Sequence, residues 1–355
     1  MDLYPGARLD RYVLLELLGE GGQGAVWKAK DPLGDGQLRA LKLVGLSLSR
    51  PNDVERVRRE ARALSRLQHP SLTTCHALFE DLQRGALGVV MDYVEAVSLK
   101  KAQDDPRLDL ALKLKVLSHI AHSLAYVHEQ GVTHRDLKLD NVLLTHEFWQ
   151  APDRPENLKL VDFGIAAVSG NPQPLTALDT VVGTLAYLAP ELIDPAHFSG
   201  DTLAPTLDIF AFGILGHKLL FGSHPAQTPP NASLIDYAMA YRHAQRLGAA
   251  WPEKLEASGL PGVLRDCLAL KVDKRIRNGT ELSLRVDRAL AEPFDTAPYQ
   301  AMEPPTHVEK ADVIPAASES VQSQPVSVTA QTAIASPGAM LGETVEYPVV
   351  IASGN

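Results

Sequence analysis

The chain has 355 residues, which is enough for about two domains at roughly 150 residues each. Hydrophobic residues make up 45% and charged residues 22%, an ordinary globular composition, and no apolar run approaches the ~18 residues of a membrane span. The net charge of −9 disfavours general binding to nucleic acid or anionic lipid, and the two cysteines cannot form a disulfide framework. The first residues lack the apolar segment of a secretory signal, so we expect a cytoplasmic protein with no membrane span and no nucleic-acid partner.

The first 90 residues predict short strands and one helix. Val57, Ala61, Leu64 and Leu67 recur at intervals of three and four, which predicts a helix over 53–67. Strands are predicted at 14–18, 25–30, 39–44 and 87–93. Helical patterns dominate from residue 108, at 108–130, 208–220, 234–247, 262–270 and 280–290. A strand-rich part followed by a helix-rich part predicts an α+β protein with two lobes.

The composition changes near residue 292. Eight prolines and many Ser, Thr, Ala and Val residues lie in 293–355, with no Lys or Arg after Lys310. This segment has no helical period and little to bury, so it predicts a disordered tail.

Three glycines, Gly19, Gly21 and Gly24, lie in the segment GEGGQGAV between two predicted strands. Glycines allow the tip of a hairpin to lie close over phosphates, because no Cβ atom obstructs the backbone N–H groups. A dinucleotide-binding loop would be followed by a helix, whereas the residues after Gly24 predict a strand. Taken alone, the segment fits either a phosphate-binding hairpin or an ordinary turn.

Three further motifs follow in order along the chain. They are HRDLKLDN at 134–141, DFG at 162–164 after a predicted strand, and APE at 189–191. With Lys42 and the glycine loop before them, they resemble the eukaryotic-like (Hanks-type) serine/threonine protein kinases, and the layout is similar to the bacterial group. The resemblance covers about residues 11–290 and implies a bilobal kinase fold. We expect an N-terminal lead over 1–10 and a kinase domain over 11–292, with an N-lobe to about 90, a hinge at about 91–97 and a C-lobe from about 98.

Phosphoryl transfer requires positioning and charge neutralisation around the γ-phosphate, which fits the residue types in these motifs. Asp136 is the candidate base, and Asn141 and Asp162 provide the hard oxygen ligands that Mg²⁺ prefers. The resemblance implies that Lys42 pairs the α- and β-phosphates and that Glu60 is its partner. Glu55 is the alternative partner, but it lies about 140° away on the same helix, so both cannot face Lys42.

The resemblance also implies the substrate class and the nucleotide site. Lys138 contacts the γ-phosphate in serine/threonine kinases, and Thr184 would hydrogen-bond Asp136 and Lys138. Met91 stands at the gatekeeper position, and the backbone of Asp92 and Val94 would bind adenine. The candidate ATP-binding residues are Leu18, Gly19, Glu20, Gly21, Gly22, Gln23, Gly24, Ala25, Val26, Ala40, Lys42, Met91, Asp92, Val94 and Leu143.

Further matches imply structural contacts. Glu191 is expected to pair with Arg277, and Asp208 to bind the backbone at His134 and Arg135. A stack between the lobes is expected from Leu64, Cys75, His134 and Phe163.

Two departures from the family pattern stand out. Leu139 occupies a position where proline is common, and the segment 145–157 is longer than the usual hairpin. Phe148 and Trp149 in that segment form either an exposed contact site or a local apolar staple.

We therefore predict a serine/threonine protein kinase that uses ATP and Mg²⁺ and acts on protein substrates, including a second copy of itself in trans. The alternatives are a pseudokinase-like ATP-binding scaffold and a small-molecule phosphotransferase. Pseudokinases usually lack Lys42, Asp136 or Asp162, and a peptide platform ending in APE argues against a small-molecule substrate.

Arg135 directly precedes Asp136, an arrangement that favours activation by phosphorylation of the segment between DFG and APE. Arg56 or Arg59 on the first helix would add positive charge. The candidate acceptors are Thr176 and Thr180.

Overall fold

The computed structural model describes residues 3–21, 24–34, 36–45, 51–81, 83–163, 182–201, 203–229, 231–248, 251–252, 255 and 259–291. All of them belong to the first of two units into which the chain divides, Met1–Pro304 and Pro305–Asn355. Gly22, Gln23, the activation candidates Thr176 and Thr180 and the predicted tail lie outside the described residues.

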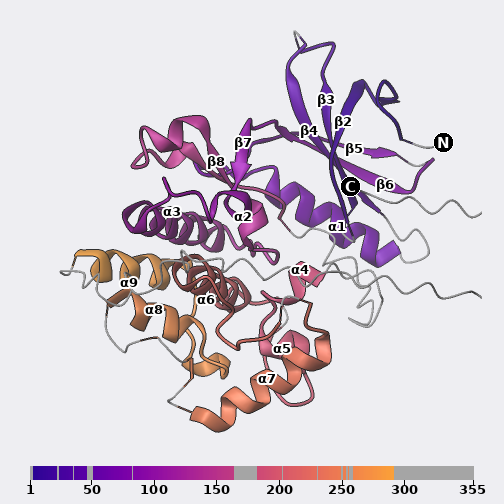
Figure 1. Cartoon of the computed structure of the whole chain (residues 1–355). Helices are drawn as coiled ribbons and strands as arrows, with labels where there is room; N and C mark the ends of the chain where they lie inside the picture. Colours follow the sequence, from indigo (N-terminus) through magenta and orange to yellow (C-terminus); the bar gives the residue numbers. More distant parts are fainter. Residues whose placement is uncertain are drawn as a thin grey trace, which may run out of the picture. The chain divides into compact units, whose positions relative to one another are not determined.

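The N-terminal part is a six-stranded antiparallel sheet in the order β1-β2-β3-β4-β6-β5 (Figure 1). Helix α1 packs on it through Val57 and Ala61, which contact a cluster that includes Val44 and Val89. The bounds are Arg8–Leu9 (β1), Tyr12–Gly21 (β2), Gly24–Lys30 (β3), Leu38–Gly45 (β4), Pro51–Leu64 (α1), Cys75–Asp81 (β5) and Ala86–Asp92 (β6).

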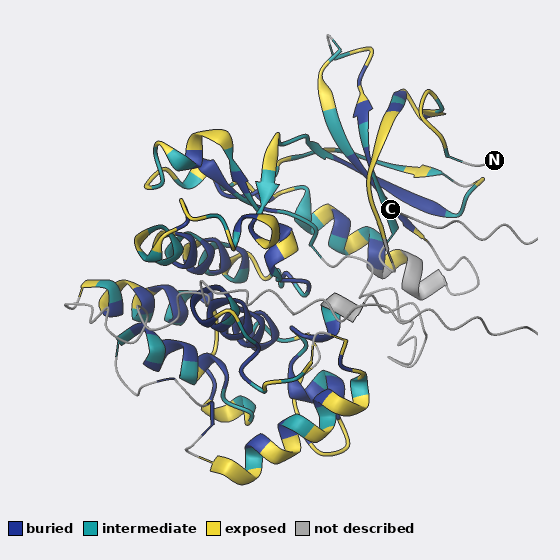
Figure 2. Cartoon of the chain, viewed as in Figure 1, coloured by how far each residue is buried: buried dark blue, intermediate teal, exposed yellow. Residues whose placement is uncertain are grey.

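The second part is mainly helical and holds the larger core. Helix α6 lies at its centre, and 15 of the 16 α6 residues are buried (Figure 2). A small antiparallel sheet, β7-β8-β9, lies beside α3. The bounds are Ala96–Ser98 (β7), Leu99–Ala102 (α2), Leu110–Glu129 (α3), Val142–Thr145 (β8), Leu158–Leu160 (β9), Val182–Leu185 (α4), Pro190–Ile193 (α5), Thr206–Phe221 (α6), Leu234–Leu247 (α7), Gly259–Cys267 (α8) and Gly279–Ala291 (α9).

The long segment before DFG forms an apolar staple. It contains two 3₁₀ turns, η2 (His146–Trp149) and η3 (Pro155–Asn157). Phe148 is fully buried in the core, and Trp149 packs edge-on against it beneath the guanidinium of Arg107, 4.2 Å from the ring centre. The Ser71 hydroxyl donates to the carbonyl of Pro155 at 2.8 Å, which ties this segment to the loop between α1 and β5. Of the two alternatives, the staple is confirmed.

Within the described part of the chain, no helix combines the length and the hydropathy that a membrane crossing requires.

Candidate active site

The catalytic loop follows α3 and is held by a carboxylate from α6. Asp208 accepts hydrogen bonds from the backbone N–H groups of His134 (2.6 Å) and Arg135 (2.7 Å), the two groups named from the sequence. A ring nitrogen of His128 lies 2.9 Å from the same carboxylate, and its other ring nitrogen accepts the backbone N–H of Gly279. Burial opposes ionisation of Asp208, but these hydrogen bonds hold its pKa below the ordinary value. A buried anion therefore fixes the loop.

Asp136 is the centre of a cluster of polar side chains. Lys138 Nζ donates to both carboxylate oxygens, at 3.1 and 2.9 Å, and also to the hydroxyl of Thr184 at 3.1 Å. The Asn141 amide donates to Asp136 Oδ2 at 2.9 Å and to its backbone carbonyl at 2.8 Å. Asp136 is buried, so these donors replace the water that would otherwise solvate its charge.

Two oxygen ligands suited to Mg²⁺ border this cluster. The Asn141 nitrogen donates to Asp136, so its amide oxygen remains as an acceptor. Asp162 has a φ of 59°, and its carboxylate lies 3.4 Å from Lys42 Nζ. Mg²⁺ binds through one or two protein carboxylates plus phosphate oxygens, and it keeps several waters. The residues present therefore fit a magnesium ion that is bound together with a nucleotide.

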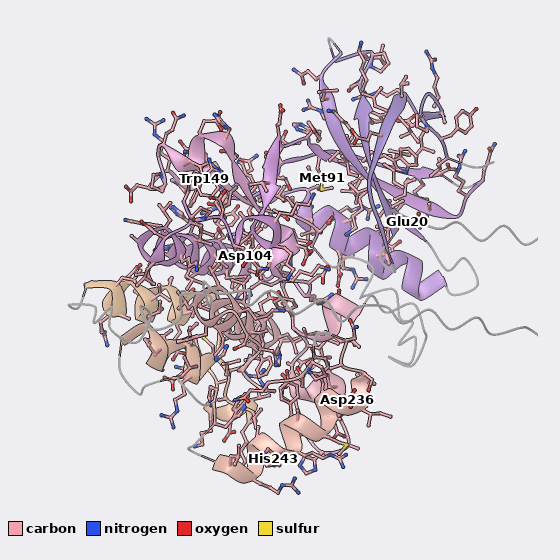
Figure 3. All side chains as sticks on the ribbon, viewed as in Figure 1. Glu20, Met91, Asp104, Trp149, Asp236 and His243 are labelled. Carbon is pink, nitrogen blue, oxygen red and sulfur yellow. The ribbon has the colours of Figure 1, made fainter. Side chains whose placement is uncertain are left out.

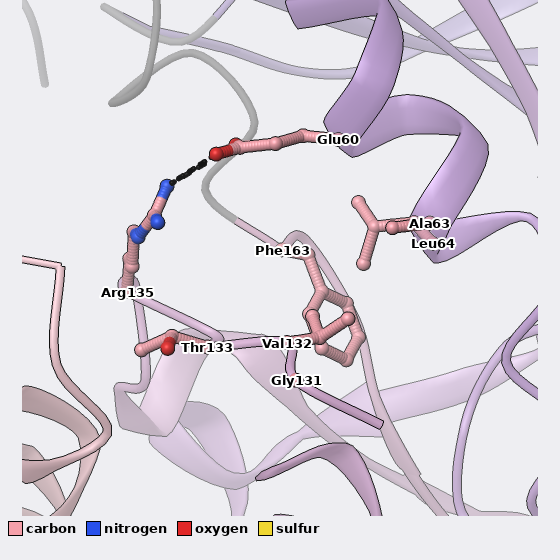
Figure 4. Close-up of a pocket in the computed structure, with 8 residues that line it drawn as sticks. All are labelled: Glu60, Ala63, Leu64, Gly131, Val132, Thr133, Arg135 and Phe163. Carbon is pink, nitrogen blue, oxygen red and sulfur yellow. Dashed lines mark hydrogen bonds and ion pairs between the residues drawn. The ribbon is translucent and has the colours of Figure 1, made fainter. Parts of the chain in front are cut away.

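Glu60 contacts the catalytic loop. Arg135 Nη1 donates to both of its carboxylate oxygens at 3.1 Å. Figure 4 shows this contact at a small cavity of about 60 Å³, which Leu64 and Phe163 also line. The Lys42–Glu60 pair that the resemblance implies stays a prediction. Glu55, the alternative partner, is exposed and pairs with Arg58 on its own helix.

The expected stack between the lobes is present in part as direct contacts. The rings of His134 and Phe163 lie 4.4 Å apart and nearly parallel. Leu64 and Cys75 both pack against the cluster of Val57, Ala61 and Val89 between α1 and the sheet. Leu64 also packs against the larger core of the helical part. The four side chains therefore join the two parts of the molecule.

The candidate nucleotide residues lie on adjacent strands. Val26 on β3 is opposite Lys42 on β4, and Ala40 on β4 is opposite Met91 on β6. Leu143 lies on β8. A second, smaller cavity of about 30 Å³ is lined by Lys42, Met91 and Asp162 among others. Figure 3 labels Met91 on β6 and Glu20 near the end of β2.

Gly24 is required by close packing. Its φ is 115°, and a Cβ atom there would lie 1.8 Å from the carbonyl oxygen of Leu43. At Gly19 a Cβ atom would meet nothing within 4 Å. The loop residues from Leu18 to Gly21 belong to β2, and those from Gly24 to Val26 belong to β3.

The hinge is held by the side chain of Asp92, a contact that sequence reasoning missed. Its carboxylate accepts the backbone N–H of Thr74 at 3.0 Å and lies 2.5 Å from a ring nitrogen of His76. Burial opposes ionisation of Asp92, and these hydrogen bonds lower its pKa overall. The carboxylate thus ties the end of β6 to β5.

The expected Glu191–Arg277 pair is wrong. Glu191 pairs with Arg275, whose two Nη atoms donate to the two carboxylate oxygens at 2.7 and 3.0 Å. Both side chains are fully buried, whereas Arg277 is 85% exposed and pairs with Glu281 on α9. The physical reason is the 3₁₀ turn at Val272–Lys274, after which Arg275 projects into the core and Arg277 lies at the surface before α9.

The segment before APE packs on the core through aromatic side chains that sequence reasoning did not single out. The Tyr187 hydroxyl lies 3.5 Å from the backbone N–H of Leu139, a donor that a proline at this position would lack. His224 is buried against Tyr241, and one of its ring nitrogens lies 3.0 Å from the carbonyl of Ala186. Burial lowers the pKa of His224 to about 3, so it is neutral.

The comparison with known proteins decides the family. The protein kinase domain model matches residues 12–290. The chain belongs to this family. Among curated kinases, it is 30% identical to the serine/threonine-protein kinase PknH of Mycobacterium bovis over 81% of this chain and 45% of PknH. It is 29% identical to PrkC of Bacillus subtilis, over 72% of this chain and 38% of PrkC, and 32% identical to PkaB of Streptomyces coelicolor, over 83% and 66%.

These relatives confirm the resemblance to bacterial Hanks-type kinases. The chain spans less than half of the length of PknH and PrkC. Among solved structures, the kinase domain of Mycobacterium tuberculosis PknI is 25% identical with a TM-score of 0.55, over 81% of this chain and all of that one. Rad53 in complex with AMP-PNP has the same fold at 21% identity and a TM-score of 0.54, over 78% and 64%. The predicted α+β, bilobal kinase fold is confirmed.

Proposed function

We propose that the chain is a serine/threonine protein kinase that transfers the γ-phosphate of ATP to Ser and Thr hydroxyls of proteins. The observation that carries the proposal is the cluster around Asp136, in which Lys138, Asn141 and Thr184 converge. Family membership and the named serine/threonine kinases among the relatives support it.

Each side chain has a role that follows from its surroundings. Asp136 orients the attacking hydroxyl and accepts its proton, because its carboxylate is fixed by donors on both sides. Lys138 donates to Asp136 and Thr184 and carries a positive charge that would stabilise the γ-phosphate. Thr184 links the segment before APE to the catalytic loop, which favours serine/threonine chemistry.

ATP would lie between the glycine loop and β8, with its base between Val26, Ala40 and Leu143. Asn141 and Asp162 would hold Mg²⁺, which when bound neutralises charge on the phosphate oxygens. Lys42 lies beside Asp162, and it would face the phosphates from β4.

The test is the variant Asp136→Asn, which keeps the shape and removes the base. Loss of general-base catalysis lowers the rate by about 10²–10⁴, and the KM for ATP should change little. The control is Asp104→Asn, an exposed carboxylate beyond α2 (Figure 3), which should keep wild-type turnover. Turnover is measured as phosphate incorporated into a generic protein substrate. A wild-type chain that binds ATP and incorporates no phosphate would favour the pseudokinase scaffold instead.

We further propose that phosphorylation of Thr176 or Thr180 activates the enzyme through Arg135. In the structure Arg135 donates to Glu60. A phosphothreonine brings about −1.5 to −2 charges and forms strong hydrogen bonds with guanidinium groups, so it would compete with Glu60 for Arg135. Glu60 would then be available to Lys42.

Mass spectrometry after incubation with ATP tests this activation. We expect phosphate on Thr176 or Thr180 and reduced turnover in the Thr176→Ala/Thr180→Ala variant. Mixing active chain with the Asp136→Asn chain tests the trans reaction, because phosphate on the inactive chain must come from another copy. An unphosphorylated wild type together with a fully active double variant would exclude this mechanism.

We propose protein substrates, no nucleic-acid partner and a cytoplasmic location. The two cysteines are free thiols, which fits a reducing compartment. The proposed reaction also requires a compartment that contains ATP.

A further inference from the structure

Lys218 is the exception in an otherwise buried helix. It is the one residue of α6 that is not buried, and its ammonium lies 4.8 Å from the centre of the Tyr187 ring. Tyr187 belongs to the segment between Thr184 and APE, and its hydroxyl lies beside the backbone of Leu139 in the catalytic loop. The Lys218 ammonium therefore lies under the platform where a protein substrate is expected.

In the part of the chain that the structure describes, the charge at this position lacks a close counter-ion. Among the described residues, no carboxylate lies within 4.0 Å of Lys218 Nζ. Burial is the main cause that lowers the pKa of Lys218, and repulsion from Lys100 on α2 adds to it, while the exposed Asp140 of the catalytic loop opposes both. Among the described residues, the charges that act on Lys218 are therefore one cation, Lys100, and one anion, Asp140.

A partly desolvated ammonium without a carboxylate partner is costly. Contact with an aromatic face recovers part of that cost. The rest would be recovered when an anionic group arrives, and the group that arrives at this surface during the reaction is the substrate.

We propose that Lys218, assisted by Lys100, is a specificity-determining residue that binds an anionic side chain of the substrate, a carboxylate or a phosphate, near the acceptor Ser or Thr. This inference rests on the proposed function. A protein substrate that carries Asp, Glu or a phosphorylated residue next to its acceptor fits the site. One that carries Arg or Lys there would meet Lys218 and would be disfavoured, although Asp140 offers it a competing contact.

The experiment measures kcat/KM for a set of acceptor peptides. Each flanking position in turn carries Glu, phosphoserine, Gln or Arg. The readout is kcat/KM for each charged peptide divided by kcat/KM for the matching Gln peptide. We expect wild type to prefer Glu or phosphoserine over Gln by about five- to tenfold at one position, with the larger ratio identifying the anion. The preference should shrink as salt is added. A wild type with no such preference, or with a preference for Arg, overturns the proposal without any variant.

Three variants locate the preference at Lys218. Lys218→Met keeps the apolar stem and should bring the Glu/Gln ratio close to one, Lys218→Arg should retain it, and Lys218→Glu should shift it towards Arg. Lys274→Met, an exposed lysine in the turn before Arg275, is the matched control and should keep the wild-type ratio. If Lys218 only supports Tyr187, the Met variant lowers kcat/KM for all peptides alike and the ratio stays unchanged, which overturns the proposal. Failure of the proposed function is distinct, because then no peptide is phosphorylated by wild type.

Discussion

Replacing Arg275 with methionine should destabilise the kinase domain severely. The change removes both hydrogen bonds to Glu191 and leaves that carboxylate buried without its cation. It also removes the hydrogen bonds from the guanidinium to the carbonyls of Thr206 (3.0 Å) and Ala269 (3.1 Å). Breaking a buried ion pair from one side costs about 3–5 kcal/mol. At about 2–4 °C per kcal/mol for a domain of this size, Tm should fall by roughly 6–20 °C.

Thermal and urea unfolding measure this loss, with Arg277→Met as the matched control. Arg277 is 85% exposed, so its variant should unfold like wild type. The double variant Glu191→Met/Arg275→Met removes both charges and should recover part of the lost stability, because no unpaired charge remains in the core. Equal losses in the Arg275 and Arg277 variants, or an Arg275→Met protein as stable as wild type, would refute this assignment of the buried pair.

Two further predictions follow from the glycine loop and from His224. Gly24→Ala should lower Tm and raise the KM for ATP, because the added Cβ would collide with the Leu43 carbonyl. Gly19→Ala, the control, should lower Tm much less. Equal Tm losses in the two variants would contradict the close packing at Gly24. His224 has a pKa of about 3 in the fold and about 6.5 when unfolded, so the unfolded chain binds the extra proton. The neutral His224 contributes fully to the free energy of unfolding above pH ~6.5. This contribution falls by up to about 1.4 kcal/mol for each pH unit as the pH is lowered towards 3. Urea unfolding across this range should show a shallower pH dependence in His224→Gln, and parallel curves would show that His224 titrates normally.

The sequence predicted the elements whose pattern is long and unambiguous. The helix predicted at 108–130 is α3, Leu110–Glu129, and its N-cap is Asp109, whose side chain accepts the N–H of Leu112. The helix predicted at 234–247 agrees with α7 at both ends. Among the site residues, Asp136, Lys138 and Asn141 lie within one short motif. These three residues are close together in space because they are close together in the sequence.

Strand β5 was missed for a physical reason. It spans Cys75–Asp81, pairs only with β6 at the edge of the sheet, and carries His, Glu and Asp among its seven residues. Edge strands of natural proteins commonly carry charged side chains, which here interrupt the apolar pattern by which a strand is recognised. The helix predicted over 53–67 ends at Leu64. The prediction was too long because the buried Leu67 continues the apolar period beyond the end of the helix.

The error at Arg277 has a different origin. Arg275 and Arg277 lie two residues apart after Asp273, and the sequence alone does not show which of them enters the core. The position of the turn at Val272–Lys274 makes the choice, and it depends on the core around α6, including Phe210, whose ring centre lies 4.8 Å from the Arg275 guanidinium. Motif spacing cannot predict a contact that depends on how one short turn packs against the core.

The partner of Glu60 shows a further limit of the same kind. The residue types determine which charges are present: the cations Lys42 and Arg135 and the carboxylates of Glu60 and Asp162. They do not determine which cation each carboxylate contacts, because that depends on how α1 packs against the rest of the molecule. In the structure Arg135 donates to Glu60 and Lys42 lies beside Asp162. Arg135 lies in the catalytic loop and Asp162 is a proposed metal ligand, so both contacts involve candidate site residues. Under the proposed activation, one phosphate would switch the enzyme by exchanging partners among charges that are already in place.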